Sequence, residues 1–278
     1  MKKFAYWCIA INITLFLSIY QRMTGPTHPK KVDIELNSED YRVKLPRSGV
    51  QQDAIISLNN IPAVLRQSQD PQLMDAERVE APKLHYRRYP TSDYYTTVDF
   101  KWKNHEWQAE LPVQPVGGKL QYYLTVGGKD YLKDEPVVIR FRNDVPAGIL
   151  IPHILFMFAA MLFAVYTLLL VITRKEYALW LKITVVTLFI GGFVMGPLVQ
   201  HVAFGPWWTG FPFGTDLTDN KTLISFLVFL VALATLKLKY NKWVVAFAVL
   251  FMVAIFTIPH SSYGSEYDYT TQQLSIGK

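Results

Sequence analysis

The chain of 278 residues contains a single cysteine, Cys8, which lies inside an apolar segment. An internal disulfide is therefore impossible, and paired-cysteine metal knuckles and dithiol redox centres are excluded. Charged residues are also scarce: Asp, Glu, Lys and Arg make up 18% of the chain, while 51% of it is hydrophobic. This composition excludes a disordered, low-complexity protein.

The sequence also lacks the short motifs of common catalytic and nucleotide-binding sites. It has no GxSxG elbow, no Walker loop, no GxGxxG unit and no HExxH pair. The residues therefore assign no catalytic centre, and whether the chain is an enzyme stays open. Lys and Arg number 28 against 22 Asp and Glu, but they lie beside apolar segments and scattered through one polar region, not in a stripe. We therefore expect no nucleic-acid partner.

The sequence contains five long apolar segments. The first, residues 4–20, follows two lysines and precedes no small-x-small cleavage site, so residues 1–21 are interpreted as an uncleaved signal anchor, with a cleaved signal peptide as the alternative. Four more segments occupy residues 149–173, 182–204, 222–236 and 243–259. Most approach the roughly 20 residues that span a bilayer as a helix. The sequence predicts five transmembrane helices, the last four forming a domain over residues 146–260.

Basic residues indicate the orientation of these helices, because Lys and Arg in short loops stay in the cytoplasm. In a five-helix arrangement, eight of them fall on one side: Lys2, Lys3, Arg174, Lys175, Lys182, Lys237, Lys239 and Lys242. The expected location is the plasma (inner) membrane, with the N-terminus in the cytoplasm. Residues 22–145 and the C-terminal tail, residues 261–278, are expected on the opposite, extracytoplasmic side of the membrane.

The predicted helices carry no ionisable side chain in their middles. Pumps and transporters need such residues, so transport is not expected unless other subunits supply the path. Gly192 and Gly196 form a small-xxx-small pair that predicts close packing of another helix. Met157, Met161 and Met195 are expected to be adaptable core residues.

Residues 22–145 show the alternation typical of strands. Residues 94–102 alternate with period two, residues 103–105 predict a hairpin, and Gly127 and Gly128 begin a second turn. Other strands are expected at residues 32–36, 41–45, 54–58, 84–89, 107–111, 120–126 and 137–141. Short strands at this spacing predict an antiparallel β-sandwich. The expected fold class is therefore an α+β membrane protein with an extracytoplasmic β-sandwich and five transmembrane helices.

The stretch LHYRRYPTSDYYTTVDFKWKNHEWQAELPVQPVGGKLQYYLTV, residues 84–126, resembles the second half of the immunoglobulin-like or fibronectin type III-like modules of bacterial extracellular proteins. The similarity lies in its aromatic strand, its WQAELP strand closed by a proline-rich turn, and its LQYYLTV strand. The resemblance implies a sandwich fold. Such modules serve as spacers, docking surfaces or carbohydrate binders, so it implies no single activity.

Aromatic and histidine side chains in this region have two interpretations. Tyr94, Tyr95 and Tyr123 are candidates for a sugar or partner platform, because flat amphipathic rings stack on other surfaces. The alternative is that they cover neighbouring strands, in which aromatic residues are common. The three histidines of the region have no ligand spacing and are expected to lie at the surface: His28, His85 and His105.

The candidate site lies at the outer ends of the predicted helices. The expected orientation brings His153, His201 and His260 to one level, and the loop before the fourth helix carries Asp216 and Asp219 to the same level. Three imidazoles with a carboxylate would suit Zn, Cu or Fe. Two of the histidines would alternatively hold a haem b. The structural alternative is that the histidines are interfacial and that Asp219 or Thr218 caps the fourth helix.

Two functions follow as hypotheses. The first is a non-catalytic subunit, with the lipid bilayer and proteins of the membrane or envelope as partners, that docks or assembles a larger complex. The second is a redox or metal-handling membrane protein built on the histidine and aspartate cluster.

Overall fold

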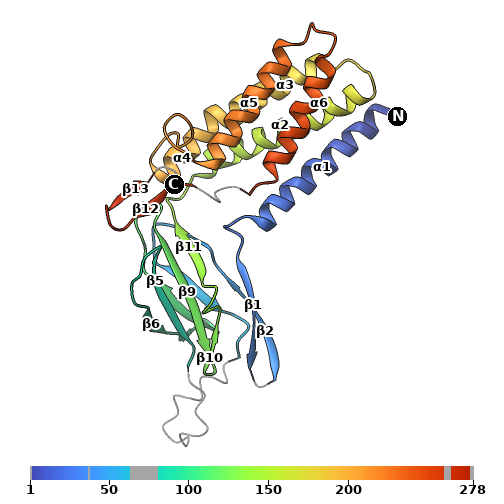
Figure 1. The fold of residues 1–278 in the computed structure, drawn as a ribbon. Helices are drawn as coiled ribbons and strands as arrows, with labels where there is room; N and C mark the ends of the chain where they lie inside the picture. Colours follow the sequence, from blue (N-terminus) through green and yellow to red (C-terminus); the bar gives the residue numbers. More distant parts are fainter. Residues whose placement is uncertain (1, 37, 63–80, 260–263, 276–278) are drawn as a thin grey trace, which may run out of the picture. The chain divides into compact units, whose positions relative to one another are not determined.

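The computed structural model describes residues 2–36, 38–62, 81–259 and 264–275, and it has a mixed α+β fold (Figure 1). The chain divides into two compact units. The helical unit consists of Met1–Pro26, Asp144–Ser265 and Ser275–Lys278, and the β unit consists of Thr27–Asn143 and Glu266–Leu274. The β unit is therefore assembled from two segments that lie on either side of the C-terminal helices in the sequence.

Apolar helices occur at all five places where the sequence predicts them. They are α1 (Lys2–Thr24), α2 (Ala147–Ile172), α3 (Ala178–Phe189), the π-helix η3 (Ile190–Met195), α4 (Gly196–Phe204), α5 (Leu217–Ala234) and α6 (Asn241–Phe256). The elements α3, η3 and α4 run on without a break. In the described part of the chain, four helices are long and apolar enough to cross a membrane: α1, α2, the continuous Ala178–Phe204 helix and α5. The fifth, α6, is a shorter apolar helix of 16 residues.

The helix α2 is the centre of the helical unit, since it contacts α1, α3, η3, α4 and α6 (Figure 1). Its buried side chains include Ala160, Ala164 and Leu170. The indole of Trp7 on α1 stacks on Tyr166 of α2 with ring centroids 4.1 Å apart. Small residues and stacked rings on α2 thus give the other helices a close-packed surface.

Glycines in the π-helix determine how closely these helices approach. A Cβ atom at Gly192 would lie 2.6 Å from Thr222 Cγ2 of α5, and one at Gly191 would lie 3.1 Å from the backbone nitrogen of Met157 in α2. At Gly196 the nearest atom would be 3.4 Å away, an ordinary contact. The expected pair of Gly192 and Gly196 is therefore corrected: the two closest approaches use the adjacent residues Gly191 and Gly192.

The β unit contains several sheets. Its strands are β1 (Lys30–Leu36), β2 (Glu39–Leu45), β3 (Ser48–Gly49), β4 (Ala54–Leu58), β5 (Lys83–Tyr89), β6 (Thr96–Asp99), β7 (Lys101–Lys103), β8 (Glu106–Leu111), β9 (Lys119–Val126), β10 (Lys129–Tyr131), β11 (Val137–Phe141), β12 (Glu266–Asp268) and β13 (Gln273–Ser275). A six-stranded sheet has the order β3-β11-β9-β5-β6, with β10 paired to β9. The order β4-β8-β7 forms a three-stranded sheet, and β1-β2 and β12-β13 form hairpins.

Side chains from both larger sheets and from the β1-β2 hairpin are buried in one hydrophobic core, which includes Ile34, Val43, Ile56, Trp107, Leu120, Tyr122 and Phe141. The predicted inner faces of β8, β9 and β11 are all buried. The turns are also as expected. Asn104 and His105, then Gly127 and Gly128, have the positive φ angles of two-residue hairpin turns. Among the described strands, the pairs of β1 with β2, β4 and β7 with β8, β5 with β6 and β9, and β10 and β11 with β9 are antiparallel, whereas β3 pairs with β11 in parallel.

The prediction of a single strand over residues 94–102 is wrong. The segment forms two strands, β6 and β7, which pair with β5 and β8 in different sheets. Phe100 lies between them and is 2% exposed, so it contributes to the core where the chain passes from one sheet to the other. A period-two pattern continues across such a crossing, because it records which residues are buried and not which strand they pair with.

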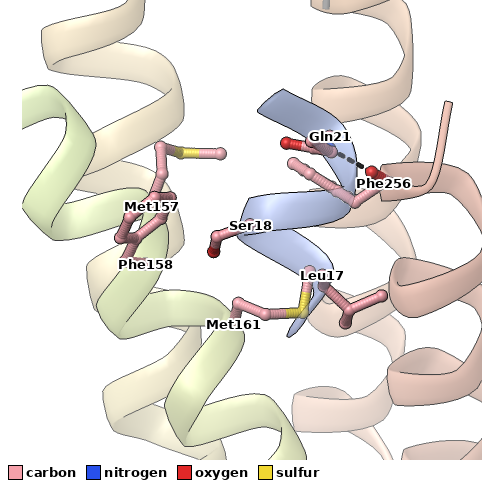
Figure 2. Close-up of a pocket in the computed structure, with 7 residues that line it drawn as sticks. All are labelled: Leu17, Ser18, Gln21, Met157, Phe158, Met161 and Phe256. Carbon is pink, nitrogen blue, oxygen red and sulfur yellow. Dashed lines mark hydrogen bonds between the residues drawn. The ribbon is translucent and has the colours of Figure 1, made fainter. Parts of the chain in front are cut away.

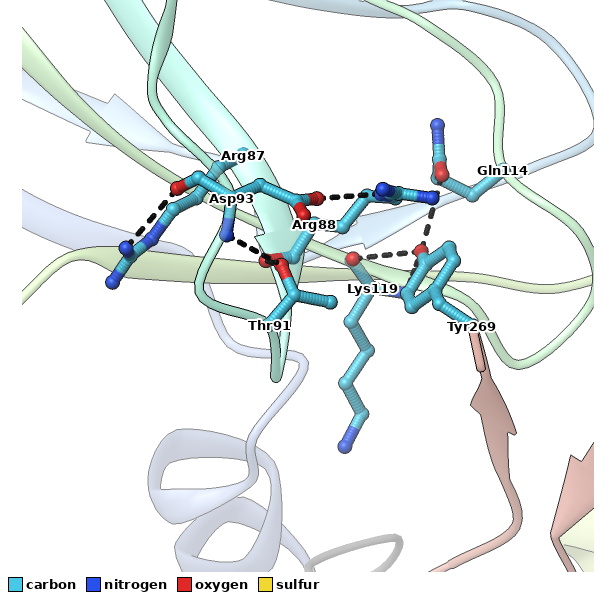
Figure 3. A network of polar contacts seen from close by, with 7 residues as sticks. All are labelled: Arg87, Arg88, Thr91, Asp93, Gln114, Lys119 and Tyr269. Atoms are coloured by element: carbon cyan, nitrogen blue, oxygen red, sulfur yellow. Dashed lines mark hydrogen bonds and ion pairs between the residues drawn. The ribbon is translucent and has the colours of Figure 1, made fainter. Parts of the chain in front are cut away.

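The C-terminal segment, which shows no strand pattern in the sequence, folds onto the β unit (Figure 3). The hydroxyl oxygen of Tyr269 accepts a hydrogen bond from the backbone N–H of Lys119 at 3.0 Å and lies 2.9 Å from the Lys119 carbonyl oxygen. Lys119 Nζ forms an ion pair with Glu266 at 2.8 Å. Burial raises the pKa of Tyr269 to about 12, so its hydroxyl stays protonated at neutral pH.

We expect Tyr269→Phe to release this segment. The substitution leaves the Lys119 N–H without its acceptor, which lowers the stability of the folded segment by about 1 kcal/mol. Hydrogen exchange at the Lys119 amide and proteolysis after residue 265 should both become faster. Tyr94→Phe is the matched control, because Tyr94 is 97% exposed. Equal protection of the segment in both variants would show that the hydroxyl does not hold it.

The tyrosines of the proposed platform mostly follow the alternative interpretation, in which they cover neighbouring strands, and one histidine expected at the surface needs correction. Tyr123 is 7% exposed, and Tyr95 packs against its ring edge-on at 5.0 Å, so of the three tyrosines only Tyr94 is fully accessible. His85 is not an ordinary surface residue either. It stacks on Tyr123 at 4.5 Å, and its two ring nitrogens lie 2.9 Å from the hydroxyls of Thr97 and Thr125.

The environment of His85 predicts a pH dependence. Burial lowers the pKa of His85, opposed by Asp130 and assisted by Lys83 and Lys133. A lowered pKa means that the unfolded chain binds the proton more readily. The neutral His85 ring therefore makes its full contribution to the free energy of unfolding above about pH 6.5, the pKa of an unfolded histidine. This contribution is lost as the pH falls through the lower pKa of the folded state. Opening of β5 and β9, measured by amide exchange corrected for the intrinsic pH dependence, should increase on acidification from pH 7.5 to 5. The His85→Gln variant should show a smaller increase. An equal increase in both proteins would contradict the role of His85.

Candidate functional site

The predicted site residues that can be described lie at one end of the helical unit, where α2 begins, α4 ends and α5 begins. Asp216 is 4% exposed and is the N-cap residue of α5. Its Oδ1 accepts hydrogen bonds from the backbone N–H groups of Thr218 at 2.7 Å and Asp219 at 3.4 Å. Asp216 therefore satisfies donors that a helix start leaves free. The sequence predicts a cap by Asp219 or Thr218, and this is corrected: Asp216 directly precedes the first helical residue, Leu217, whereas Thr218 and Asp219 lie inside the first turn.

Asp219 has a different role, which is to fold the preceding loop. Its Oδ2 accepts hydrogen bonds from the backbone N–H of Thr209 at 2.7 Å, from the Thr209 hydroxyl at 3.0 Å and from the Gly210 N–H at 3.1 Å. Asn220 Oδ1 accepts from the N–H of Phe211 at 2.7 Å. Both side chains come from the first turn of α5. The aromatic loop, defined as residues 205–214, is therefore fastened to the start of that helix.

The two described histidines each donate to a backbone carbonyl. His153 Nδ1 lies 2.9 Å from the Gly191 carbonyl oxygen in the π-helix, and His201 Nδ1 bonds to the carbonyl oxygen of Gly205. The His201 ring stacks on Trp207 at 4.1 Å, with 5° between the rings. Because a carbonyl can only accept, Nδ1 carries the proton in both rings. In the neutral form, Nε2 then has a lone pair that can act as a base or a metal ligand.

The expected cluster of three histidines with an aspartate stays a prediction. His260 lies outside the described residues. Among the residues that are described, no three His, Cys, Asp or Glu side chains come together in a group that could hold a metal ion. Asp216 and Asp219 use oxygen atoms for the cap and the loop, as described above. The structure thus brings the two carboxylates together at one helix start and gives each histidine a separate backbone partner.

Lys221 is the residue that the sequence analysis missed. Counted there as part of a loop, it lies in α5 and is 1% exposed. Its Nζ donates a hydrogen bond to the Ile258 carbonyl oxygen at 2.7 Å and lies 5.6 Å from the centre of the Phe256 ring. A cation is favourable at the C-terminal end of a helix, which here is the end of α6. The signal in the sequence is its spacing: Lys221 and Ser225 are four residues apart and share the buried face of α5.

A second side chain bonds to the same end of α6. Gln21 of α1 donates through Nε2 to the Phe256 carbonyl oxygen, so α1 and α5 each provide a donor for a carbonyl that has no partner within the helix (Figure 2). Beside this bond lies a cavity of about 40 Å³, lined by Leu17, Ser18, Gln21, Met157, Phe158, Met161 and Phe256. Such a volume suits a few water molecules, whereas sites for organic ligands measure about 300 Å³ or more.

Comparison with models of protein families, with curated proteins and with solved structures finds no match for this chain. Its class therefore rests on its own fold and residues. The chain is an α+β protein with antiparallel sheets and with four or five apolar helices that could span a membrane. The polar side chains at the described end of the helices bond to backbone groups of loops and helix ends.

Proposed function

We propose that the chain is a multi-pass subunit of the plasma (inner) membrane, whose exported β-sandwich docks or assembles a larger membrane or envelope complex. The observation that carries this proposal is the composition of the β unit, which joins Thr27–Asn143 to Glu266–Leu274. The contacts of Tyr269 and Glu266 with Lys119 can form only if both segments lie on the same side of the membrane.

This requirement supports a topology with five crossings. A chain that leaves one side at residue 144 and returns to it by residue 265 must cross the bilayer an even number of times. The helix α2, the Ala178–Phe204 helix and α5 are three candidates, so α6 is the fourth although it has only 16 residues. A helix of that length crosses by tilting little or by thinning the bilayer. With α1 there are five crossings, and the basic loops place the N-terminus in the cytoplasm.

Cysteine accessibility in intact cells tests this arrangement. In a Cys8→Ser background, we expect an impermeant maleimide to label Tyr94→Cys in the β unit and Gln272→Cys in the tail. Leu238→Cys, between α5 and α6, should react only after the cells are opened; it is 44% exposed. Labelling of Leu238→Cys from outside, together with Tyr94→Cys, would overturn the five-crossing topology.

The docking role is supported by the architecture of the β unit. Two sheets share one core, as in the sandwich modules that residues 84–126 resemble, and such modules commonly serve as docking surfaces. Tyr94 is an aromatic side chain that is 97% exposed, and aromatic residues are enriched at protein interfaces. A photoreactive amino acid at position 94 should form one discrete crosslinked species in cells, whereas one at Lys31 on the β1-β2 hairpin should not. Purification as a monomer with no discrete crosslink at position 94 would count against the role.

A metal or haem protein is the second candidate, because one observation favours it. His153 and His201 both donate Nδ1–H to backbone carbonyls, the arrangement that usually orients a metal-binding histidine through Nε2. Metal analysis and an absorption scan of the purified protein for a haem Soret band test this candidate. Bound metal or haem that is lost in both His153→Gln and His201→Gln would support it. A protein that contains neither metal nor haem would exclude it.

A further inference from the structure

We infer that the aromatic loop, residues 205–214, inserts into the headgroup and upper acyl region of the bilayer rather than standing in water. The inference rests on the proposed membrane location of the helices. The loop connects α4 and α5, and each of these belongs to a helix that is long and apolar enough to cross a membrane. It therefore lies where the chain turns at the membrane boundary.

The first argument is the character of its accessible surface. The largest accessible side chains of the loop are Trp207, Phe211 and Phe213, which are 55%, 69% and 74% exposed. Residues 205–215 contain no charged side chain, whereas the connections at the opposite ends of the same helices contain Arg174, Lys175 and several lysines. Exposed aromatic rings without neighbouring charge are typical of side chains that occupy the membrane interface.

The second argument is that the backbone N–H groups of residues 209–211, 213 and 214 are hydrogen-bonded within the chain. Asp219 and Asn220 accept the N–H groups of Thr209, Gly210 and Phe211. Further along, the N–H groups of Phe213 and Gly214 donate to the Gly210 carbonyl oxygen, that of Asp216 donates to Thr209, and Pro212 has none. Irregular backbone is tolerated in apolar surroundings only when its polar groups are bonded internally. A loop that projects into water has no such requirement.

The third argument is rigidity. A Cβ atom at Gly210 would lie 2.7 Å from Asp219 Cβ, so the loop is packed directly against α5. Trp208 stacks on Phe193 at 5.6 Å and donates its Nε1–H to the Phe211 carbonyl oxygen at 3.0 Å. The exposed rings are thus held outward by a fixed backbone. Rings that are fixed in place lose little conformational entropy on entering the lipid.

Site-specific fluorescence in vesicles tests the inference. In a Cys8→Ser background, Phe213→Cys is labelled with an environment-sensitive dye and reconstituted in phosphatidylcholine vesicles. Leu227→Cys on α5 is the lipid-facing control, and Tyr94→Cys on the β unit is the aqueous control; these positions are 51% and 97% exposed. We expect nitroxide-labelled lipids to quench the dye at position 213 several-fold more than the dye at position 94, and iodide to quench it less.

The outcomes separate the inference from the proposed function. If lipid nitroxides quench the dye at position 227 but not the dye at position 213, the helices are in the membrane and the loop is not, which overturns the inference alone. Protection of position 213 from both iodide and lipid nitroxides would show that protein, from the same chain or from a second copy, covers this position in place of lipid, and it would also overturn the inference. If position 227 is not quenched by lipid, the membrane location itself is wrong. Phe211→Cys provides a second labelling position if the first variant does not fold.

Discussion

Gly192→Val is expected to destabilise the helical unit by about 3 kcal/mol, the upper part of the usual range for an overpacked core. A Cβ atom at this position would lie 2.6 Å from Thr222 Cγ2, closer than carbon atoms can pack, so either the Thr222 side chain or α5 itself must shift away from the π-helix. Since the start of α5 also holds the aromatic loop and Lys221, a shift of α5 should disturb both. The measurement is the thermal unfolding midpoint of the full chain in mild detergent.

Gly148→Val is the matched control for this substitution. Gly148 is also in a helix, α2, but a Cβ atom there would meet nothing within 4 Å. The two variants add the same side chain and both replace a helical glycine, the residue with the lowest helix propensity after proline, so a difference between them measures the clash. Equal unfolding midpoints would show that α5 does not pack on Gly192.

Asp219→Ala is also expected to destabilise the helical unit by about 3 kcal/mol. The substitution removes a carboxylate oxygen that accepts three hydrogen bonds from Thr209 and Gly210. It leaves buried donors without an acceptor, and each such group costs about 1 to 3 kcal/mol. The aromatic loop should then detach from α5. Proteolysis within residues 205–214 in detergent should become faster as the unfolding midpoint falls.

Two neighbouring substitutions make this prediction specific. Asp219→Asn keeps an acceptor oxygen and should retain most of the stability. Asp216→Ala removes only the helix cap, with a cost of about 1 kcal/mol, and should leave the loop protected from protease. If Asp216→Ala were as damaging to the loop as Asp219→Ala, the assignment of separate roles to the two carboxylates would be wrong.

The local features of the fold could be predicted because each depends on neighbours in sequence. The inner faces of β8, β9 and β11 and the turns at residues 104–105 and 127–128 follow from alternation and turn chemistry. The five apolar helices follow from segment length and composition. A polar cap at this helix start could be predicted in kind, but its residue is Asp216 and not the expected Asp219 or Thr218, since the cap depends on where the first helical turn begins.

What sequence reasoning missed depends on contacts between distant segments. A lysine followed by an apolar run is usually a flanking charge, and its burial becomes evident only when α6 brings the Ile258 carbonyl to its ammonium group. The division of residues 94–102 between two sheets has the same cause, because strand pairing is decided by β5 and β8 and not by the segment itself.

The amino-acid sequence alone determined which stretches are apolar helices and located most strands of residues 27–143, because hydrophobic periodicity and turn residues act over a few positions. Only the tertiary structure decided that the C-terminal segment completes the β unit, that His153 and His201 donate to backbone carbonyls, and that Asp219 folds the aromatic loop. Each of these is a directional hydrogen bond or a contact between segments. Such bonds form only after packing has brought their donors and acceptors within about 3 Å of each other, and no local pattern records that distance.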